Sequence, residues 1–256
     1  MKPLSNIILS GFTDEYSPDL ELQCEAAVRL GLGHIELRGV GGRSFSKLTD
    51  AELLRVRETL DSHGLSLSAL GSPLGKSPAD EDDPELLSRA GRIFDAAGIL
   101  GTDRIRMFSF YPGGTSGDAF RSSVYSKLEK LLREADRRGL TLCHENEAKI
   151  YGESPERCLE LLDEFGGKLR AVFDMGNFVL GGYDPADAYR KLYPYIEYFH
   201  IKDALAAGAI VPPGKGEARI ADILSDFDRN AERPFFASLE PHLQTFDGRG
   251  ALSGSV

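Results

Sequence analysis

Residues 137–147 read RRGLTLCHENE, and this stretch contains the unit that decides the fold. Basic residues followed by Gly139 are typical of a helix end, because glycine readily adopts the left-handed conformation that terminates many helices. The mostly apolar run LTLC that follows has the length and composition of a buried strand. It leads directly into a polar cluster, His144 to Glu147. The stretch therefore predicts a helix, a strand and then a loop that carries functional side chains.

The same unit occurs three times earlier in the chain, at residues 29–40, 62–73 and 100–114. Each copy has a glycine at a helix end, a short apolar segment and a polar loop. Strands that alternate with helices in this way form parallel βαβ units. Counting such segments over the whole chain predicts eight strands, at Ile7–Gly11, Ile35–Arg38, Leu65–Leu70, Ile105–Phe110, Leu140–Glu145, Leu169–Asp174, Ile196–Lys202 and Phe235–Glu240.

Eight strands with seven helices between them is the count of a (β/α)8 TIM barrel. Three helix starts support it: a capping box from Thr49 to Glu52, and proline at the first helical position after Ser154 and after Asp184. A doubly wound open sheet usually has fewer strands and a glycine-rich turn after the first strand, whereas residues 11–18 read GFTDEYSP. We therefore predict an α/β fold, a (β/α)8 TIM barrel.

The end of the chain departs from a complete barrel. After Glu240 only sixteen residues remain (256 − 240), and they read PHLQTFDGRGALSGSV, which is too rich in glycine and serine for a packed helix. We expect a single barrel domain over residues 1–256 whose C-terminal eighth helix is missing or shortened. An uncovered eighth strand also favours a homo-oligomer.

The bulk composition narrows the class of partner. The chain is 41% hydrophobic and 27% charged, with a net charge of −10. Binding to nucleic acid or to an anionic membrane requires a basic face, so neither is expected. The three cysteines form neither a disulfide framework nor a CxxC zinc motif, and the amino-terminal segment lacks the long apolar stretch of a secretory signal. We therefore expect a cytoplasmic protein.

Polar side chains stand where the last four predicted strands end. In a TIM barrel the active site lies at these carboxyl ends, and they carry Glu145, Asp174, His200 and Glu240. Because strand residues alternate between faces, Glu145 points into the barrel and His144 points outward. Three carboxylates and one imidazole suit Mn²⁺, Mg²⁺, Co²⁺ or Zn²⁺, and the lack of thiolates argues against structural zinc. The alternative is four separate, salt-bridged groups.

At these residues the chain resembles the xylose isomerase-like TIM barrel family, the sugar phosphate isomerases and epimerases. The resemblance extends over nearly the whole chain, through the motifs GFTDEYSPD, GSPLGK, RIRMFSFY, HENEAKIYG, FDMGNF, HIKD, PPGKGE and SLEPH in this order. It implies one divalent metal ion, with Mn²⁺ expected, held by Glu145, Asp174, His200 and Glu240. It also implies that Glu145 and Glu240 are the catalytic acid and base on opposite faces of a bound ketose.

Two features depart from the family pattern. Many members carry a histidine three residues after the strand-six aspartate, where this chain has Asn177. Asparagine can hydrogen-bond a hydroxyl but does not titrate, so the substrate would be oriented differently. The early strands lack the additional histidines that hold three metals in endonuclease IV relatives, so a nuclease is not expected.

Five residues are expected substrate contacts, because they lie at strand ends or in the loops that follow, where binding residues are commonly found. Their side chains suit a phosphate, a carboxylate or a polyol, although ordinary pairing with surface carboxylates is the alternative for the basic ones. The five are Lys202, Arg106, Asn177, Lys76 and Lys215.

These features together predict a metal-dependent isomerase or epimerase of carbohydrate metabolism. Its substrate would be a small-molecule sugar, either a ketose, a sugar phosphate or a related polyol ketone, which reacts by proton transfer next to the carbonyl through an enediolate. One alternative is a lyase of the keto-inositol dehydratase type, which would expel a hydroxyl group from the same kind of intermediate. Another is a non-catalytic sugar-binding or assembly barrel.

Overall fold

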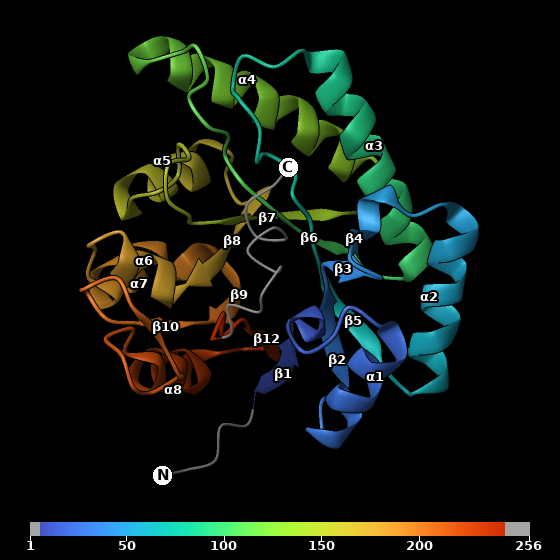
Figure 1. The fold of residues 1–256 in the computed structure, drawn as a ribbon. Helices are drawn as coiled ribbons and strands as arrows, with labels where there is room; N and C mark the ends of the chain where they lie inside the picture. The colour runs from blue at the N-terminus through green and yellow to red at the C-terminus, as the bar shows by residue number, and fades with distance from the viewer. Residues whose placement is uncertain (1–5, 244–256) are drawn as a thin grey trace.

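Eight parallel strands form a nearly closed barrel in a computed structural model that describes residues 6–243 (Figure 1). Their order around the barrel is β1-β12-β9-β8-β7-β6-β5-β2. The predicted TIM-barrel fold and all eight predicted strands are therefore confirmed. The strands are β1 (Ile7–Gly11), β2 (His34–Leu37), β5 (Ser66–Gly71), β6 (Arg104–Met107), β7 (Thr141–Glu145), β8 (Leu169–Asp174), β9 (Ile196–Ile201) and β12 (Phe235–Leu239).

The two end strands of this order, β1 and β2, complete the barrel without a backbone ladder between them in residues 6–243. A serine pair links this side of the barrel instead. The Ser68 hydroxyl on β5 donates to the Ile35 carbonyl on β2 at 3.2 Å and lies 2.7 Å from the Ser10 hydroxyl on β1. The contact between Ser10 and Ser68 therefore joins β1 to β5 on the side of the barrel where β1 and β2 meet.

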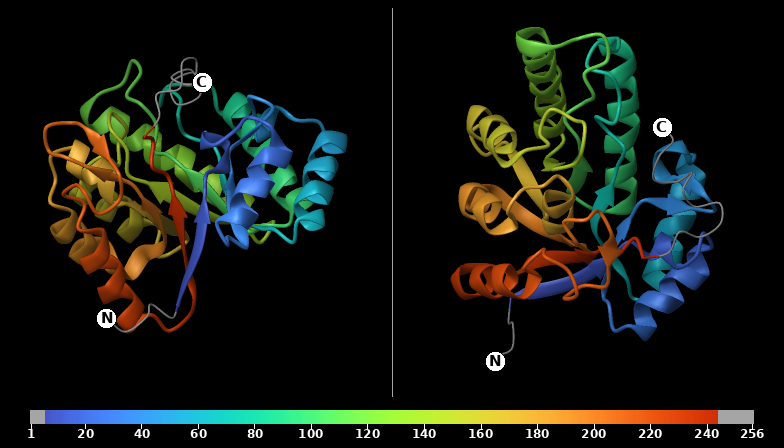
Figure 2. Two further views of the ribbon diagram at one scale, coloured as in Figure 1. Left: turned by 60° about the horizontal axis from the view of Figure 1, so that its bottom comes forward. Right: turned by 60° about the vertical axis from the view of Figure 1, so that its left-hand side comes forward.

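Helices surround the ring of strands (Figures 1 and 2). The predicted capping box is present, because Thr49 accepts from the Glu52 amide and the Glu52 carboxylate accepts from the Thr49 amide. Ser154 and Asp184 cap the helices that begin at the following prolines. The helices are α1 (Leu20–Arg29), α2 (Asp50–Ser62), α3 (Asp83–Leu100), α4 (Gly117–Asp136), α5 (Pro155–Glu164), α6 (Met175–Leu180), α7 (Pro185–Leu192) and α8 (Ile220–Asn230).

One connection differs from the prediction of a single helix between successive strands, because β8 and β9 are joined by both α6 and α7. The segment after residue 243, where we expected the closing helix to be missing or shortened, lies outside the described residues. No helix within residues 6–243 is long and apolar enough to cross a membrane.

Short elements lie between the main strands and helices. They are η1 (Thr13–Glu15), η2 (Phe45–Lys47), η3 (Tyr193–Tyr195) and the antiparallel pairs β3 (Gly39–Val40) with β4 (Arg43–Ser44) and β10 (Asp203–Ala204) with β11 (Ile210–Val211).

The main apolar core lies between the strands and the helices, while the barrel interior holds a small mixed layer of Ala69, Cys143, Val172 and Tyr198. Cys143 is thus the small interior residue that its strand parity predicts. His144 points the other way, as expected, and its Nε2 atom lies 2.9 Å from a serine hydroxyl. The interior between this layer and the carboxyl ends of the strands is polar, and it forms the candidate functional site.

Candidate metal centre

Four side chains converge at the carboxyl ends of neighbouring strands. Glu145 ends β7, Asp174 ends β8, His200 lies on β9 and Glu240 directly follows β12. Parallel pairing sets Asp174 opposite His200 in register. One ligand atom from each residue lies within 4.8 Å of those from the other three, and all four residues are buried. The fold therefore brings together every residue predicted to hold the metal.

The His200 ring presents its Nδ1 atom to the carboxylates. That atom lies 3.2 Å from Glu145 Oε1, 3.2 Å from Glu240 Oε2 and 4.0 Å from Asp174 Oδ2. His200 Nδ1 and Glu240 Oε2 are fully buried, and neither has a hydrogen-bond partner within residues 6–243. Buried polar atoms are normally satisfied, and this donor set is one that divalent cations prefer. The residues present therefore fit a divalent metal ion.

The balance of buried charges around the cluster also favours a bound divalent cation. Arg38 contacts Glu240 at 3.3 Å, but its charge is already offset by Asp14 at 2.9 Å. With neutral His200, the buried charged groups around the cluster keep two uncompensated negative charges, which is costly in a low-dielectric interior unless a cation is present. The groups counted are four carboxylates, Glu36, Glu145, Asp174 and Glu240, against two basic side chains, Arg106 and Lys202.

The pKa values in the cluster diverge. Burial alone would raise the pKa of Glu145, but His200 and Arg106 outweigh it and hold that pKa below its ordinary value. The pKa of Glu240 also lies well below its ordinary value, because Lys202 and His200 outweigh burial. Burial raises the pKa of Asp174 to about 6, despite the attraction of Lys202. The two glutamates are therefore ionised more readily than the aspartate.

Burial would lower the pKa of His200, but the surrounding glutamates raise it well above its ordinary value. In the metal-free protein a proton on the imidazole therefore partly neutralises the cluster. A divalent ion would have to displace that proton, since a histidine ligand binds metal in its neutral form.

A buried carboxylate supports the far edge of the imidazole. Glu36, in the middle of β2, places its two carboxylate oxygens 3.3 and 3.2 Å from His200 Nε2. The Tyr198 hydroxyl donates to the same carboxylate at 2.8 Å. A carboxylate behind a metal-binding histidine fixes the ring orientation and its tautomer. Our sequence analysis missed Glu36, although a charged residue inside the apolar segment GHIELRGV is a signal that could have identified it.

Asp174 is held by its surroundings as well as by its strand. Its Oδ1 atom caps helix α6 by accepting from the Asn177 amide at 2.8 Å. The Asn146 side chain pairs with its backbone in both directions, accepting from the amide and donating to the carbonyl. Asn146, from the HENE cluster, therefore joins the ends of β7 and β8.

Three of the five predicted substrate contacts touch the cluster. Arg106 Nη1 donates to Glu145 Oε2 at 2.8 Å, and Lys202 Nζ donates to Asp174 Oδ2 at 2.8 Å. Lys202 Nζ also lies 3.2 Å from Glu240 Oε2. The Asn177 amide group donates to Glu145 Oε1 at 3.3 Å and accepts from Lys202 at 3.2 Å. The pKa values of Lys202 and Arg106 are raised, since the carboxylates outweigh burial, so both remain cationic.

The other two predicted contacts lie further out. Lys76 pairs with Glu147 at 2.7 Å and lies 4.3 Å above the Phe108 ring, which also carries Arg106 at 4.7 Å. Lys76 and Arg106 therefore contact the same aromatic ring. Lys215 is exposed, and no ion pair or hydrogen bond connects its side chain to the cluster within residues 6–243.

The loop that carries Lys215 is fixed by the last residue of the HIKD motif. The buried Asp203 carboxylate accepts from the amides of Gly214, Gly216 and Ala218 at 2.8 to 3.0 Å. The HIKD motif therefore supplies the residue that anchors the PPGKGE loop.

Comparison with known proteins identifies the same kind of barrel. A family model described as xylose isomerase-like TIM barrel matches residues 24–242. The fold resembles the probable 3-DHS dehydratase AsbF of Bacillus anthracis, with 20% identity and a TM-score of 0.72 over 90% of this chain and 89% of that one. It also resembles a xylose isomerase-like TIM barrel protein from Mycobacterium smegmatis in complex with magnesium, with 19% identity and a TM-score of 0.71 over 88% and 82% of the two chains.

A third similar structure is the 3-keto-D-glucoside 4-epimerase YcjR from E. coli, with 16% identity and a TM-score of 0.72 over 96% of this chain and 95% of that one. No curated protein matches the sequence. At these identities the solved structures establish the fold alone.

Proposed function

This chain belongs to the xylose isomerase-like TIM barrel family, and we propose that it is a divalent-metal-dependent isomerase or epimerase acting on a ketose or polyol ketone. The observation that carries the proposal is the buried meeting point of His200 Nδ1 and Glu240 Oε2, two atoms 3.2 Å apart that lack hydrogen bonds within the described chain. Mn²⁺ is the ion we expect there, with Mg²⁺, Co²⁺ and Zn²⁺ as alternatives.

The proposed roles follow from position and charge. Glu145 and Glu240 lie at equal distances from His200 Nδ1 and come from different strands, so they are placed to act as a pair. Their lowered pKa values keep both carboxylates ionised at neutral pH, which is the state a base requires. One removes the proton next to the carbonyl, and the other, after taking up a proton from solvent, delivers it to the opposite face of the substrate. The bound cation would stabilise the negative charge that develops on the substrate oxygens.

The neighbouring polar side chains would position these groups and the sugar. Arg106 holds Glu145 in place through its 2.8 Å contact. Lys202 and Asn177 lie at the edge of the cluster, hydrogen-bonded to each other, and can turn toward substrate hydroxyls. Lys76 and Lys215 are proposed as outer contacts for a hydroxyl or phosphoryl group.

The direct test is hydrogen exchange at the reacting carbon. The Mn²⁺-loaded protein is incubated with a panel of ketoses and ketose phosphates in deuterated water, and products are followed by NMR. The proposal expects solvent deuterium at the carbon next to the carbonyl, together with a new epimer or isomer. The variants Glu145→Gln and Glu240→Gln should abolish it, while the surface control Glu129→Gln should not.

The same experiment separates the alternatives. Loss of water from the substrate would indicate the lyase, whose chemistry is that named for the B. anthracis relative. Binding of sugars without any exchange would indicate a non-catalytic barrel and would contradict the proposed function.

A further inference from the structure

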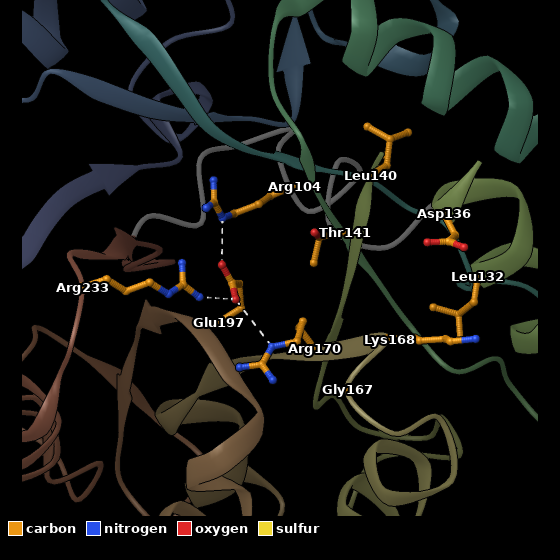
Figure 3. A pocket seen from close by; sticks show the side chains of 10 residues that line it. All are labelled: Arg104, Leu132, Asp136, Leu140, Thr141, Gly167, Lys168, Arg170, Glu197 and Arg233. Carbon is orange, nitrogen blue, oxygen red and sulfur yellow. Dashed lines mark hydrogen bonds and ion pairs between the residues drawn. The ribbon is translucent and has the colours of Figure 1, made fainter. Parts of the chain in front are cut away.

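A second pocket lies at the amino-terminal end of the barrel, opposite to the candidate metal centre (Figure 3). Its volume is about 420 Å³, within the roughly 300–1,000 Å³ of pockets that hold small molecules. Its wall comes from the first residues of several strands. Arg104 and Thr141 begin β6 and β7, Arg170 and Glu197 are the second residues of β8 and β9, and Arg233 precedes β12.

Three arginines in this pocket share one carboxylate. Glu197 contacts Arg104 at 3.1 Å, Arg170 at 3.5 Å and Arg233 at 2.7 Å, and Figure 3 shows the three side chains directed toward it. The Glu197 side chain is only 8% exposed. Burial would raise the pKa of this carboxyl, but Arg233 and Arg104 outweigh burial and lower it. A single negative charge thus faces three positive ones.

The pocket as a whole is basic, although the chain carries a net charge of −10. Its lining has four basic side chains against two acidic ones, and Asp103 from outside the lining pairs with Arg104 at 2.9 Å. Lys168 has no ion-pair partner within the part of the chain that the structure describes. The four basic residues are Arg104, Lys168, Arg170 and Arg233, and the two acidic ones are Asp136 and Glu197.

The donors in the pocket are only partly used. Arg170 is committed, because its two terminal nitrogens donate to backbone carbonyls at 3.3 Å. Arg104 uses Nε and Nη1, which leaves Nη2. Arg233 uses only Nη2 and its side chain is 60% exposed. The Thr141 hydroxyl has no hydrogen bond among the described residues, and in Figure 3 it lies on the side of Arg104, whereas the Lys168 side chain extends away from the arginines.

We infer that this pocket binds a phosphate-bearing small molecule. Arginine forks and a lysine ammonium are the standard partners of phosphoryl oxygens. The contacts with Glu197 show that the guanidinium groups are directed toward a shared carboxylate. The unused donors of Arg104, Arg233 and Thr141 would bind the phosphoryl group, and Lys168 adds positive charge on another wall of the pocket. The site lies at the opposite end of the barrel from the metal centre, so its ligand is distinct from the substrate of the proposed reaction.

Calorimetric titration of the full chain tests this inference. The probes are inorganic phosphate, fructose 6-phosphate and fructose, and each is titrated into the wild type and into a Lys168→Ala/Arg233→Ala double variant. Both substituted side chains are exposed, and thermal unfolding checks that the variant stays folded. The double variant should bind the phosphate-bearing probes roughly tenfold more weakly or worse, as expected for the loss of one charged hydrogen bond and of a second positive charge in the pocket.

Two controls locate the binding. Arg190→Ala/Arg229→Ala removes the same charge from exposed positions on α7 and α8 and should bind like the wild type. Lys202→Met removes a cation at the metal centre and should leave the binding of inorganic phosphate unchanged. Equal affinity for both phosphate probes would identify free phosphate as sufficient, and tighter binding of fructose 6-phosphate that the Lys168→Ala/Arg233→Ala variant loses would identify a phosphorylated metabolite. Absence of phosphate-dependent binding, or binding that persists in the Lys168→Ala/Arg233→Ala variant, would overturn the inference.

Discussion

Glu36 Oε2 lies 3.2 Å from Nε2 of His200, on the edge of the ring opposite to the strand-end carboxylates. The ring is further enclosed by Phe12, whose centroid lies 5.2 Å away in an edge-on arrangement. Glu36 and Phe12 therefore fix the orientation of the imidazole, and its Nδ1 atom is directed at the carboxylates of the cluster. A strand on the far side of the barrel thus determines how the proposed metal ligand is presented.

Removing this support should weaken metal binding. Glu36→Gln keeps the shape of the side chain but replaces the carboxylate, and second-sphere changes of this kind typically cost about 10–100-fold in metal affinity. The dissociation constant for Mn²⁺, measured by calorimetry or electron paramagnetic resonance, reports this independently of activity. Tyr198→Phe removes only the hydrogen bond to Glu36 and should have a smaller effect. Unchanged affinity in Glu36→Gln would show that the contact does not position the ligand.

Replacing either proposed acid–base residue should reduce turnover more than it reduces substrate binding. For Glu145→Gln and for Glu240→Gln we expect a loss in kcat on the order of 10²–10⁴-fold, the usual contribution of a positioned acid or base. The rate is measured with metal in excess, so that weaker metal binding does not account for the loss. A variant that keeps wild-type kcat would exclude that residue from proton transfer.

His144 predicts a pH dependence of stability. Burial lowers its pKa from 6.5 to about 4, so between these values the unfolded chain binds more protons than the folded one. Stability is therefore fully present above about pH 6.5 and falls as the pH drops toward 4, by up to about 3 kcal/mol. Urea unfolding of the metal-free protein at several pH values measures this. His144→Gln should show a flatter profile than the wild type, and an equally steep profile would contradict the assignment.

The Asp203 anchor should control the order of the PPGKGE loop. Asp203→Ala leaves four backbone amides without this acceptor, those of Ala204 and of three loop residues, and we expect a loss of about 1–3 kcal/mol in unfolding free energy. Hydrogen exchange should accelerate at Gly214, Gly216 and Ala218. Asp203→Asn retains one carbonyl oxygen and should be intermediate. Exchange rates equal to those of the wild type would show that the loop is held by other contacts.

Much of the fold could be predicted from local sequence, and the exceptions have physical causes. The bounds of β1 and β8 agree with the prediction, because each is a short apolar run with a clear end. β6 ends at Met107 rather than Phe110, since the amides of Phe108 and Phe110 bond to carbonyls of the loop after β5. The alternation of side chains along β6 gives no information about these loop carbonyls, so the end of the strand could not be predicted from it.

In the candidate metal centre, too, some residues could be predicted from local sequence and others could not. The four strand-end residues could be predicted because parallel strands bring their carboxyl ends to one rim. Helix α6 was missed because Asp174 is both the end of β8 and the cap of the helix. Glu36 was missed because its role depends on β9, which lies across the barrel and 160 residues later in the chain (196 − 36).

The measurement that tests the central claim most directly is metal content by mass spectrometry. The wild type and an Asp174→Asn/Glu240→Gln double variant are purified, supplied with Mn²⁺ and freed of unbound ion. We predict about one divalent ion per wild-type chain and none in the double variant, with circular dichroism showing that both are folded. A wild type that retains no metal after this treatment, or a variant that binds as much as the wild type, would contradict a metal centre at Glu145, Asp174, His200 and Glu240.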